Sequence, residues 1–291
     1  MKFIRYTIRS LWVKLINDKI LAFACVMGLF TWIYARPYVA FCAETDHPIT
    51  WCLFPFFLTS PSYLVLFYLG VIYVNSDIPF QQSSQLYQII RVGQRRWAAA
   101  QLIGIFLRSV ALTVLTALLT LLPFIGRLKL SWKWGKVALT LASQHRIVSE
   151  FYDSWDPMLE FAYETMQTYS PLGLMALTMV IVSMICTLLG LIMYLGSITA
   201  GRAVGLTAAT ALCLMVYLVQ NAFSAYRLGI SRFVPTSWAQ VAFAPERFDG
   251  FLRLPSVRYM LTCLTAGIMI LGVCSLLIVT RTELNWENSD A

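Results

Sequence analysis

The chain has 291 residues, of which 59% are hydrophobic and only 12% are Asp, Glu, Lys or Arg. Soluble globular proteins carry about 25% charged and about 45–50% apolar residues, so too little polar surface is present here to cover a water-soluble core. The composition excludes disordered, collagen-like and disulfide-scaffold classes, and it predicts an integral membrane protein.

The formal net charge of +8 does not indicate a nucleic-acid partner. The 22 Lys and Arg residues are spread over the chain ends and loops, and they form no dense basic run. Basic flanks of this kind orient a membrane protein and attract anionic lipid. We therefore expect membrane lipid, and no nucleic acid, to contact these residues.

Six apolar stretches predict helices that cross the membrane. About 20 apolar residues at 1.5 Å per residue are needed to cover the hydrocarbon core. The first stretch is short unless it continues past Pro37, Ser170-Pro171 is a typical helix start, and a turn over 196–202 separates the fourth and fifth. The sequence thus predicts an all-α integral membrane protein, a single transmembrane domain over 1–291, with spans over 20–35, 54–74, 97–125, 171–195, 203–222 and 259–280.

An amphipathic segment precedes the first span. Residues 1–19 alternate apolar and basic side chains at helical spacing, with Trp12 on the apolar side, which predicts a helix in the membrane interface. The alternative is a plain basic flank of the first span. Five basic residues precede this span and Arg36 alone follows it, so the positive-inside rule predicts cytoplasmic N- and C-termini.

Two long segments, 126–170 and 223–258, face the outside in this topology. The first predicts two amphipathic helices at the outer membrane surface, one over its tryptophan-rich half and one capped by Asp156 with Pro157 in its first turn. The apolar stretch 233–251 of the second can dip into the membrane, provided that protein buries its backbone.

Cys42 and Cys52 fall in a polar loop and are candidates for a disulfide, although their spacing alone does not establish the geometry. The other five cysteines lie in apolar segments, where a thiol behaves as a small hydrophobe. Cys42, His47 and Cys52 lack a fourth metal ligand, so a coincidence within a loop is favoured over a metal site.

The sequence carries none of the usual chemistry of ion-driven carriers or enzymes. All 14 Asp and Glu residues and both His residues fall outside the predicted spans, whereas ion-coupled carriers keep such groups in the membrane. No phosphate loop, G-x-S-x-G elbow or H-E-x-x-H motif is present. We expect a chain that is not an enzyme and holds no cofactor, and that takes its energy from another subunit.

Arg108 is the one charged residue well inside a predicted span. An arginine at the centre of a membrane helix costs about 2.5–3.5 kcal/mol on insertion scales, so it should face a partner or a water-filled space. The alternatives are that its side chain snorkels to the inner surface, or that the helix begins further along the chain.

The segment 77–96 joins the second and third spans on the predicted cytoplasmic side. Residues 82–92 predict a short amphipathic helix with Leu86, Ile89 and Ile90 on one face, and Gly93 can adopt the left-handed conformation that ends a helix. One interpretation is an ordinary basic loop. The other is a docking helix presented to a soluble partner.

This layout resembles the membrane subunits of type-2 ABC exporters, which are permeases of six crossings that work with a separate ATPase. The resemblance rests on the amphipathic N-terminal segment, the larger outer segment between the fifth and sixth spans, and the motif Asp77-x-Pro-Phe followed by Tyr87-x-x-x-Arg91-x-Gly-x-Arg95-Arg-Trp. The long loop over 126–170 departs from simpler members. The resemblance implies a coupling helix that sits in a groove of the ATPase through Leu86, Tyr87, Ile89, Ile90, Arg91 and Arg95.

The predicted function is the permease subunit of an ATP-driven exporter in the bacterial plasma membrane. Its cargo would be a peptide, lipid or drug-like molecule, with an antimicrobial peptide as the first candidate. Its partners would be an ABC ATP-binding subunit, which holds ATP and Mg²⁺, and a second copy or a sister permease. The alternative is an immunity or sensor subunit that binds an antimicrobial peptide without transporting it.

Overall fold

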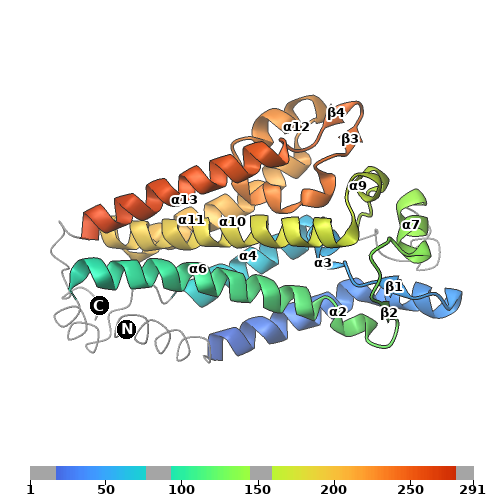
Figure 1. The fold of residues 1–291 in the computed structure, drawn as a ribbon. Helices are drawn as coiled ribbons and strands as arrows, with labels where there is room; N and C mark the ends of the chain where they lie inside the picture. Colours follow the sequence, from blue (N-terminus) through green and yellow to red (C-terminus); the bar gives the residue numbers. More distant parts are fainter. Residues whose placement is uncertain (1–17, 77–92, 145–158, 280–291) are drawn as a thin grey trace.

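The computed structural model of the protein describes residues 18–76, 93–144 and 159–279, which are mostly helical (Figure 1). The expected interfacial helix over 1–19 lies outside the described residues except for Asp18 and Lys19, and the expected docking helix over 82–92 lies outside them entirely. In the part of the chain that is described, five helices are long and apolar enough to cross a membrane, namely α2 (Asp18–Thr45), α6 (Gln94–Leu119), α10 (Pro171–Thr199), α11 (Arg202–Asn221) and α13 (Val257–Val279). The chain is therefore a multi-pass, all-α membrane protein.

The first membrane helix is longer than the apolar stretch that predicted it. α2 continues through Pro37 to Thr45, so the first span does extend past the proline. Its buried side, which includes Tyr34, Tyr38 and Phe41, packs on the rest of the protein both before and after the proline. Packing on this face supports the helix beyond the point at which proline removes a backbone hydrogen bond.

The connection between α10 and α11 is shorter than the turn expected over 196–202. α10 begins as predicted, with the Ser170 hydroxyl accepting a hydrogen bond from the Gly173 amide at 3.2 Å, but it continues to Thr199. Only Ala200 and Gly201 then separate it from α11. Gly201 has a φ of 100°, which glycine adopts without strain and other residues do not.

The predicted second span is not one continuous helix. It is divided into α3 (Phe54–Phe57) and α4 (Pro61–Asn75), so the prediction of an unbroken helix over 54–74 is wrong. Pro61 starts a new helix, since proline cannot donate the backbone hydrogen bond that would continue the old one. The 15 residues of α4 cover about 22 Å at 1.5 Å per residue, less than the roughly 30 Å of hydrocarbon.

α10 is the central helix of the bundle. It packs against α6, α11 and α13, which surround it, and it is more completely buried than the other membrane-length helices (Figure 1). α4 packs against α11 and α2, and α2 in turn contacts α6. Close helix approach is clearest between α10 and α11, where a Cβ built on Gly196 would lie 2.6 Å from the Cα of Gly205.

At one end of the bundle the connecting segments fold into a structured layer, which we call the cap. The cap lies at the right of Figure 1, and the end of the bundle away from it is called the opposite end. Besides α3, the cap contains β1 (Ile49–Thr50), η1 (Leu122–Phe124), β2 (Leu128–Lys129), α7 (Lys136–Ser143), α9 (Tyr163–Thr168), α12 (Ser224–Ser231), η2 (Pro235–Ala239), η3 (Val241–Phe243), β3 (Arg247–Phe248) and β4 (Phe251–Leu252).

Two minimal strand pairs tie cap segments together. β1 and β2 pair in parallel, with Ile49 opposite Leu128, and β3 and β4 form an antiparallel hairpin with Arg247 opposite Leu252. The first pair joins the segment after α2 to the start of the predicted outer loop 126–170, which follows α6.

The helices expected in the loop 126–170 are confirmed only in part. α7 occupies part of the tryptophan-rich half and buries Val137, Ala138 and Leu141, as its amphipathic spacing predicts. The predicted start of the second helix at Asp156-Pro157 is not tested. Those two residues lie outside the described residues, but the chain over 159–162 is irregular and α9 starts only at Tyr163.

A physical reason for this late start is a tertiary hydrogen-bond pair. The Tyr38 hydroxyl donates to the carbonyl of Leu159 and accepts from its amide, both at 3.0 Å. The amide of Glu160 donates to the Thr59 hydroxyl at 3.0 Å. Backbone groups held by side chains of α2 and the α3–α4 linker do not form a helical turn with one another.

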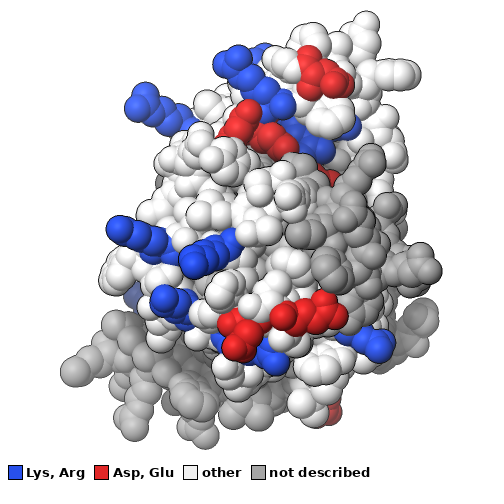
Figure 2. Space-filling view, turned by 90° about the vertical axis from the view of Figure 1, so that its right-hand side faces the viewer, with Lys and Arg blue, Asp and Glu red and all other residues white. Residues whose placement is uncertain are grey.

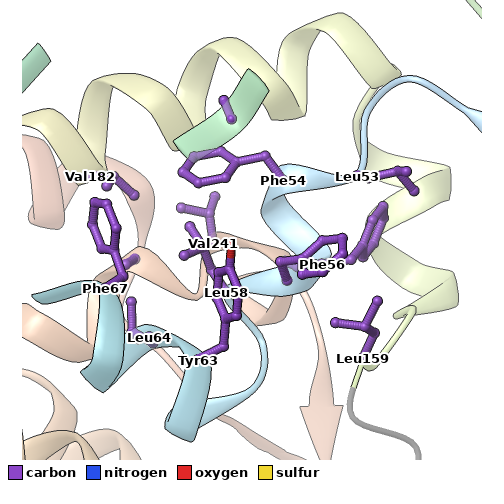
Figure 3. Close-up of a cluster of buried hydrophobic side chains, with 14 of the residues drawn as sticks. Leu53, Phe54, Phe56, Leu58, Tyr63, Leu64, Phe67, Leu159, Val182 and Val241 are labelled. Atoms are coloured by element: carbon purple, nitrogen blue, oxygen red, sulfur yellow. The ribbon is translucent and has the colours of Figure 1, made fainter. Parts of the chain in front are cut away.

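The interior of the cap is built from aromatic side chains. Figure 3 shows Phe54, Phe56 and Tyr63 gathered with Leu159 and Val241, residues from segments far apart in the sequence. The Phe56 ring stacks on that of Phe161 with centroids 4.4 Å apart and meets the Trp134 ring edge-on at 5.8 Å. The predicted outer loops are thus a packed part of the protein.

Within the stretch 233–251, Phe233 is exposed but residues 234–243 are largely buried in protein, as a re-entrant segment requires. Thr236, Trp238 and Gln240 are all nearly inaccessible. The Gln240 amide donates to the carbonyl of Thr59 at 2.8 Å, and the Tyr68 hydroxyl donates to the carbonyl of Thr236 at 2.9 Å. These bonds fix η2 against α4 and the α3–α4 linker.

Candidate functional site

The predicted coupling residues Leu86, Tyr87, Ile89, Ile90 and Arg91 lie outside the described residues. The structure describes the residues on either side of the segment 77–92 that contains them. Arg95, the sixth predicted coupling residue, is exposed in the first turn of α6. Gly93 has the expected positive φ of 87°, but its ψ of 144° is not that of a left-handed helix end, and it is the N-cap of α6.

Both edges of the segment 77–92 are at the opposite end of the bundle. α4 ends at Asn75 and α6 begins at Gln94, so the segment leaves and re-enters the bundle at the same end. The short α10–α11 connection and the last turn of α13 are also at this end (Figure 1). A partner bound here would contact neither the cap nor its charged face.

A hydrogen bond and a cation–π contact hold the α4 edge of the segment. The Lys19 ammonium, in the first turn of α2, donates to the Ser76 hydroxyl at 3.0 Å and lies 5.4 Å from the centroid of the Tyr73 ring. The end of α4 is therefore tied to the beginning of α2.

Near both edges of the segment, buried polar groups have no hydrogen-bond partner in the part of the chain that the structure describes. Asn75 is inaccessible, and neither its amide nitrogen nor its oxygen has a hydrogen-bond partner among the described residues. The same holds for the indole nitrogen of Trp97 and for the hydroxyl of Tyr194 in α10. Leaving a buried polar group unpaired costs about 1–3 kcal/mol, so these groups mark a place where the packing is not at its optimum.

These three groups lie where α4, α6 and α10 meet. A Cβ built on Gly190 of α10 would be 2.5 Å from Ile105 Cγ2 and 3.8 Å from the Asn75 amide nitrogen. Ile105, Trp97 and Tyr194 belong to one buried cluster. Asn75 and Trp97 therefore anchor the two edges of the segment in the same part of the bundle, against α10.

Sequence reasoning missed Asn75, Trp97 and Tyr194 as site residues. The available signal was their position, because Asn75 and Trp97 stand immediately beside a segment that was singled out as a docking helix. An amide at the end of an apolar stretch is equally typical of a helix end at the membrane surface, and burial decides between the two.

Arg108 is buried inside the protein, at the middle of the membrane-spanning part of α6. Its residue is 3% exposed, and its Nε donates to the carbonyl of Gly104 at 3.3 Å. α6 begins at Gln94, so the alternative of a helix that starts further along the chain is wrong. Snorkelling along the lipid surface does not fit a side chain enclosed by the bundle.

The part of α6 that follows Arg108 carries buried hydroxyls that turn back onto their own helix. Ser109, Thr113 and Thr116 each donate to the carbonyl four residues earlier, at 2.8–2.9 Å. These hydroxyls are satisfied within α6, as Ser and Thr in membrane helices commonly are. Arg108 makes the same kind of bond through its Nε, and it differs from these neutral neighbours in carrying a buried charge.

If the chain works with a separate ATPase, as its sequence predicts, Arg108→Leu should insert and fold normally but impair the ATP-driven activity of the complex about tenfold or more, within the usual range of coupling between sites. Removing a buried charge can leave stability unchanged or raise it, whereas a charge with a working role cannot be replaced by leucine. ATP hydrolysis by the purified complex and its thermal unfolding measure the two effects separately. Arg127→Leu, at an exposed cap position, is the matched control. Full activity of the Arg108 variant would assign this residue to packing alone.

The cap presents charges of both signs. Figure 2 shows basic and acidic side chains intermixed over this end of the molecule. Arg253 joins them at one point, with Nη1 3.1 Å from a Glu160 oxygen and 2.9 Å from a Glu246 oxygen, and its guanidinium lies 4.1 Å from the Phe243 ring centroid. Burial raises the pKa of Glu246, and this effect exceeds the lowering by Arg253. These contacts hold η3 against the segment before α9.

The cysteines provide no disulfide in the described part of the chain. Cys42 and Cys52 are both free and buried, and the Cys52 thiol donates to the carbonyl of Pro171 at 3.0 Å. Burial raises the pKa of Cys52 to about 12, so it stays a protonated, unreactive thiol at neutral pH. Among the described residues no three metal-ligating side chains gather into a site.

Comparisons of the chain with models of protein families, with curated proteins and with solved structures find no match.

Proposed function

We propose that the chain is the permease subunit of a type-2 ABC exporter, and that the segment between α4 and α6 docks a separate ATPase. In this proposal the chain does no catalysis: ATP and Mg²⁺ bind to the ATPase, and the permease provides a path across a bacterial plasma membrane. The cargo is a peptide, lipid or drug-like molecule, and a second permease chain completes the path.

The observation that carries the proposal is the place of the motif-bearing segment in the fold. The segment joins α4 to α6 at the end of the bundle away from the cap, and Arg95 is exposed where it re-enters. A soluble partner at this end has access to two neighbouring membrane helices through one short segment. Helix-in-groove docking of an amphipathic segment is a common way to make such a contact.

A mechanical route from this segment into the bundle supports the same proposal. At its first edge, Ser76 is tied to Lys19 of α2, and Asn75 is buried against α10. At its second edge, Trp97 is packed in the cluster that contains Tyr194. A displacement of the segment would therefore act at once on α2, α4, α6 and α10, which is what a change of access across a helix bundle requires.

The unpaired groups of Asn75, Trp97 and Tyr194 fit a joint with more than one arrangement. If these polar groups are unpaired in one arrangement of the helices and paired in a second, the pairing stabilises the second arrangement and narrows the difference in free energy between them. ATP binding to the ATPase then needs to supply only a modest difference to move α4 and α6 relative to α10.

Purification of the chain from its native membrane tests the proposal directly. We expect an ABC ATPase to remain bound through detergent extraction and size-exclusion chromatography in a fixed ratio to the chain. An immunity or sensor subunit would purify without it. Absence of any ATPase from gently extracted material would contradict the exporter assignment.

Orientation gives an independent prediction, because docking requires the opposite end of the bundle to face the cytoplasm. On intact cells, Lys133→Cys in the cap should react with a membrane-impermeant maleimide, whereas Ala200→Cys in the α10–α11 connection should react only after the cells are opened. Both positions are exposed in the structure. The wild-type chain is the control, since most of its cysteines lie within apolar helices and Cys52 is buried. The reverse labelling pattern would exclude docking at this end.

A further inference from the structure

α12 has its apolar side chains facing away from the protein. Phe223, Tyr226, Ile230 and Phe233 are spaced by three, four and three residues, which places them on one face of the α12 turn and its flanks. Their exposed fractions are 83%, 70%, 37% and 84%. We call these four residues the aromatic stripe.

The basic residue within α12 faces the other way. Arg227 Nη2 donates to the carbonyl of Gln220 at 2.8 Å and to that of Ala222 at 3.3 Å, and the guanidinium lies 5.6 Å from the Phe248 ring centroid. These carbonyls are at the C-terminal end of α11, where helical acceptors lack partners in the helix. Arg227 thereby caps α11 and turns the aromatic stripe outward.

A second contact fixes the same orientation. Ser231 is the one fully buried residue of α12, and its carbonyl accepts a hydrogen bond from the Trp238 indole of η2 at 2.6 Å. The helix is therefore held from its inner side at both ends, by Arg227 near its beginning and by Ser231 at its end. The outward direction of the stripe follows from bonded contacts within the protein.

Such an arrangement is unfavourable in water. Moving a Phe or Ile side chain from water into an apolar environment is favourable, and a helix on an aqueous surface would turn its arginine outward and its phenylalanines inward. The medium outside the aromatic stripe must therefore be apolar. Lipid and a second protein are the two media available to a membrane protein.

Continuity with the membrane helices favours lipid. α12 begins three residues after the end of α11, whose outward residues Leu214 and Leu218 are 49% and 61% exposed. Figure 1 shows α12 beside the cap-end turns of α13, at the margin of the bundle, whereas α7 stands farther out along its axis. The Tyr259 hydroxyl, in the first turn of α13, donates to the carbonyl of Arg232 at 3.4 Å.

We propose that α12 lies in the lipid interface on the cap side of the membrane, with the aromatic stripe at the boundary of headgroups and acyl chains. Arg232 and Arg258 are exposed beside the stripe, and their long side chains reach the lipid phosphates. Helices of this kind sink about 5–10 Å into the interface, and tyrosine is enriched at that depth. This inference goes beyond the proposed exporter function and does not depend on it.

Hydrogen bonds connect α12 to η2, and η2 to α11, so the position of α12 in the lipid affects the interior of the protein. Ser231 binds Trp238 of η2, and in the same 3-10 helix Thr236 donates to the carbonyl of Leu212 in α11 at 2.7 Å. The depth at which α12 sits in the lipid therefore sets the position of η2 against the membrane helices.

Nitroxide scanning of the full chain in vesicles of phosphatidylcholine and phosphatidylglycerol tests the proposal. Tyr226→Cys and Phe233→Cys, labelled with a nitroxide, should collide readily with oxygen and poorly with a water-soluble nickel chelate. Leu218→Cys on α11 is the lipid-facing control, Lys133→Cys in the cap is the aqueous control, and labelled wild-type protein gives the background.

Each outcome decides the matter, since the substituted side chains are exposed and their replacement removes little packing within the chain. A ratio of oxygen to nickel accessibility close to that of Leu218 supports the lipid interface. A ratio close to that of Lys133 would place the stripe in water. Exclusion of both reagents would show that a second protein chain covers it. Either of the last two results would overturn the proposal.

Discussion

For a permease that docks its ATPase as proposed, the double substitution Ile89→Asp and Ile90→Asp is expected to release the ATPase from the purified chain and to abolish transport. The two isoleucines, with Leu86, form the apolar face of the predicted docking helix, and such a face needs a groove in another protein. Loss of one well-buried anchor at an interface costs about 2 kcal/mol or more, roughly thirtyfold in affinity, and two charged replacements should cost more. A detergent pull-down of the ATPase, quantified against wild type, measures the loss.

A matched control is available on the other face of the same segment. Gln85→Asp with Gln88→Asp introduces the same two charges on the predicted polar face, and we expect this variant to retain its ATPase. Membrane insertion of both variants should equal that of wild type, because all four positions lie outside every span predicted from the sequence. Retention of the ATPase by the isoleucine variant would remove the main support for the exporter proposal.

The second large effect concerns the cap. Phe56→Ala should lower the free energy of unfolding by about 3–5 kcal/mol, the usual cost of truncating a buried phenylalanine. Phe56 is inaccessible and contacts the rings of Phe161 and Trp134, which come from two different segments of the predicted outer loop. Thermal unfolding in detergent, followed by near-UV circular dichroism of the aromatic side chains, measures the change.

Trp132→Ala serves as its control. This tryptophan is in the same loop, but its residue is 78% exposed, so we expect a change within about 0.5 kcal/mol. Equal unfolding temperatures for the Phe56 variant and wild type would show that the loops 126–170 and 223–258 do not pack as a unit with the bundle.

The apolar helices were predictable because their lengths follow from the thickness of the membrane. The starts and ends of α11 and α13 fall within a few residues of the apolar stretches, and the Ser170 cap marks the start of α10. The division of the second stretch at 58–60 was not predictable in this way. Phe54, Phe56 and Phe57 are apolar because they fill the cap, and an apolar residue in a sequence does not say whether protein or lipid surrounds it.

The irregular chain before α9 has a similar explanation. Leu159 satisfies both of its backbone groups on Tyr38, a residue 121 positions earlier. The local pattern after Asp156-Pro157 favours helix over the residues that follow, whereas the contact with Tyr38 accompanies an irregular backbone over 159–162. Patterns of a few residues predict what a segment does alone, and they carry no information on a side chain that arrives from another helix.

For the candidate site, the sequence predicted which residues lie within or beside a membrane helix better than it predicted whether protein, lipid or water surrounds them. Arg108 was correctly placed within a membrane helix, while its burial inside the bundle, rather than toward lipid, depends on how α6 is rotated. Asn75 and Trp97 were not predicted as site residues, because a polar end of an apolar stretch normally lies at the membrane surface. Their meeting point with Gly190 exists only after α4, α6 and α10 have packed.

The hydrogen bonds of the cap also set an order of assembly during synthesis. The carbonyl of Thr59 receives its partner from Gln240, 181 residues later, and the Tyr68 hydroxyl donates to Thr236, 168 residues later. The ribosome delivers α2 and α4 to the membrane long before η2 exists, and contacts between such distant residues form late and slowly. The early helices must therefore be held in the bilayer with an unfinished cap. A chain that stalls before η2 would leave the Thr59 carbonyl and the Tyr68 hydroxyl without these partners.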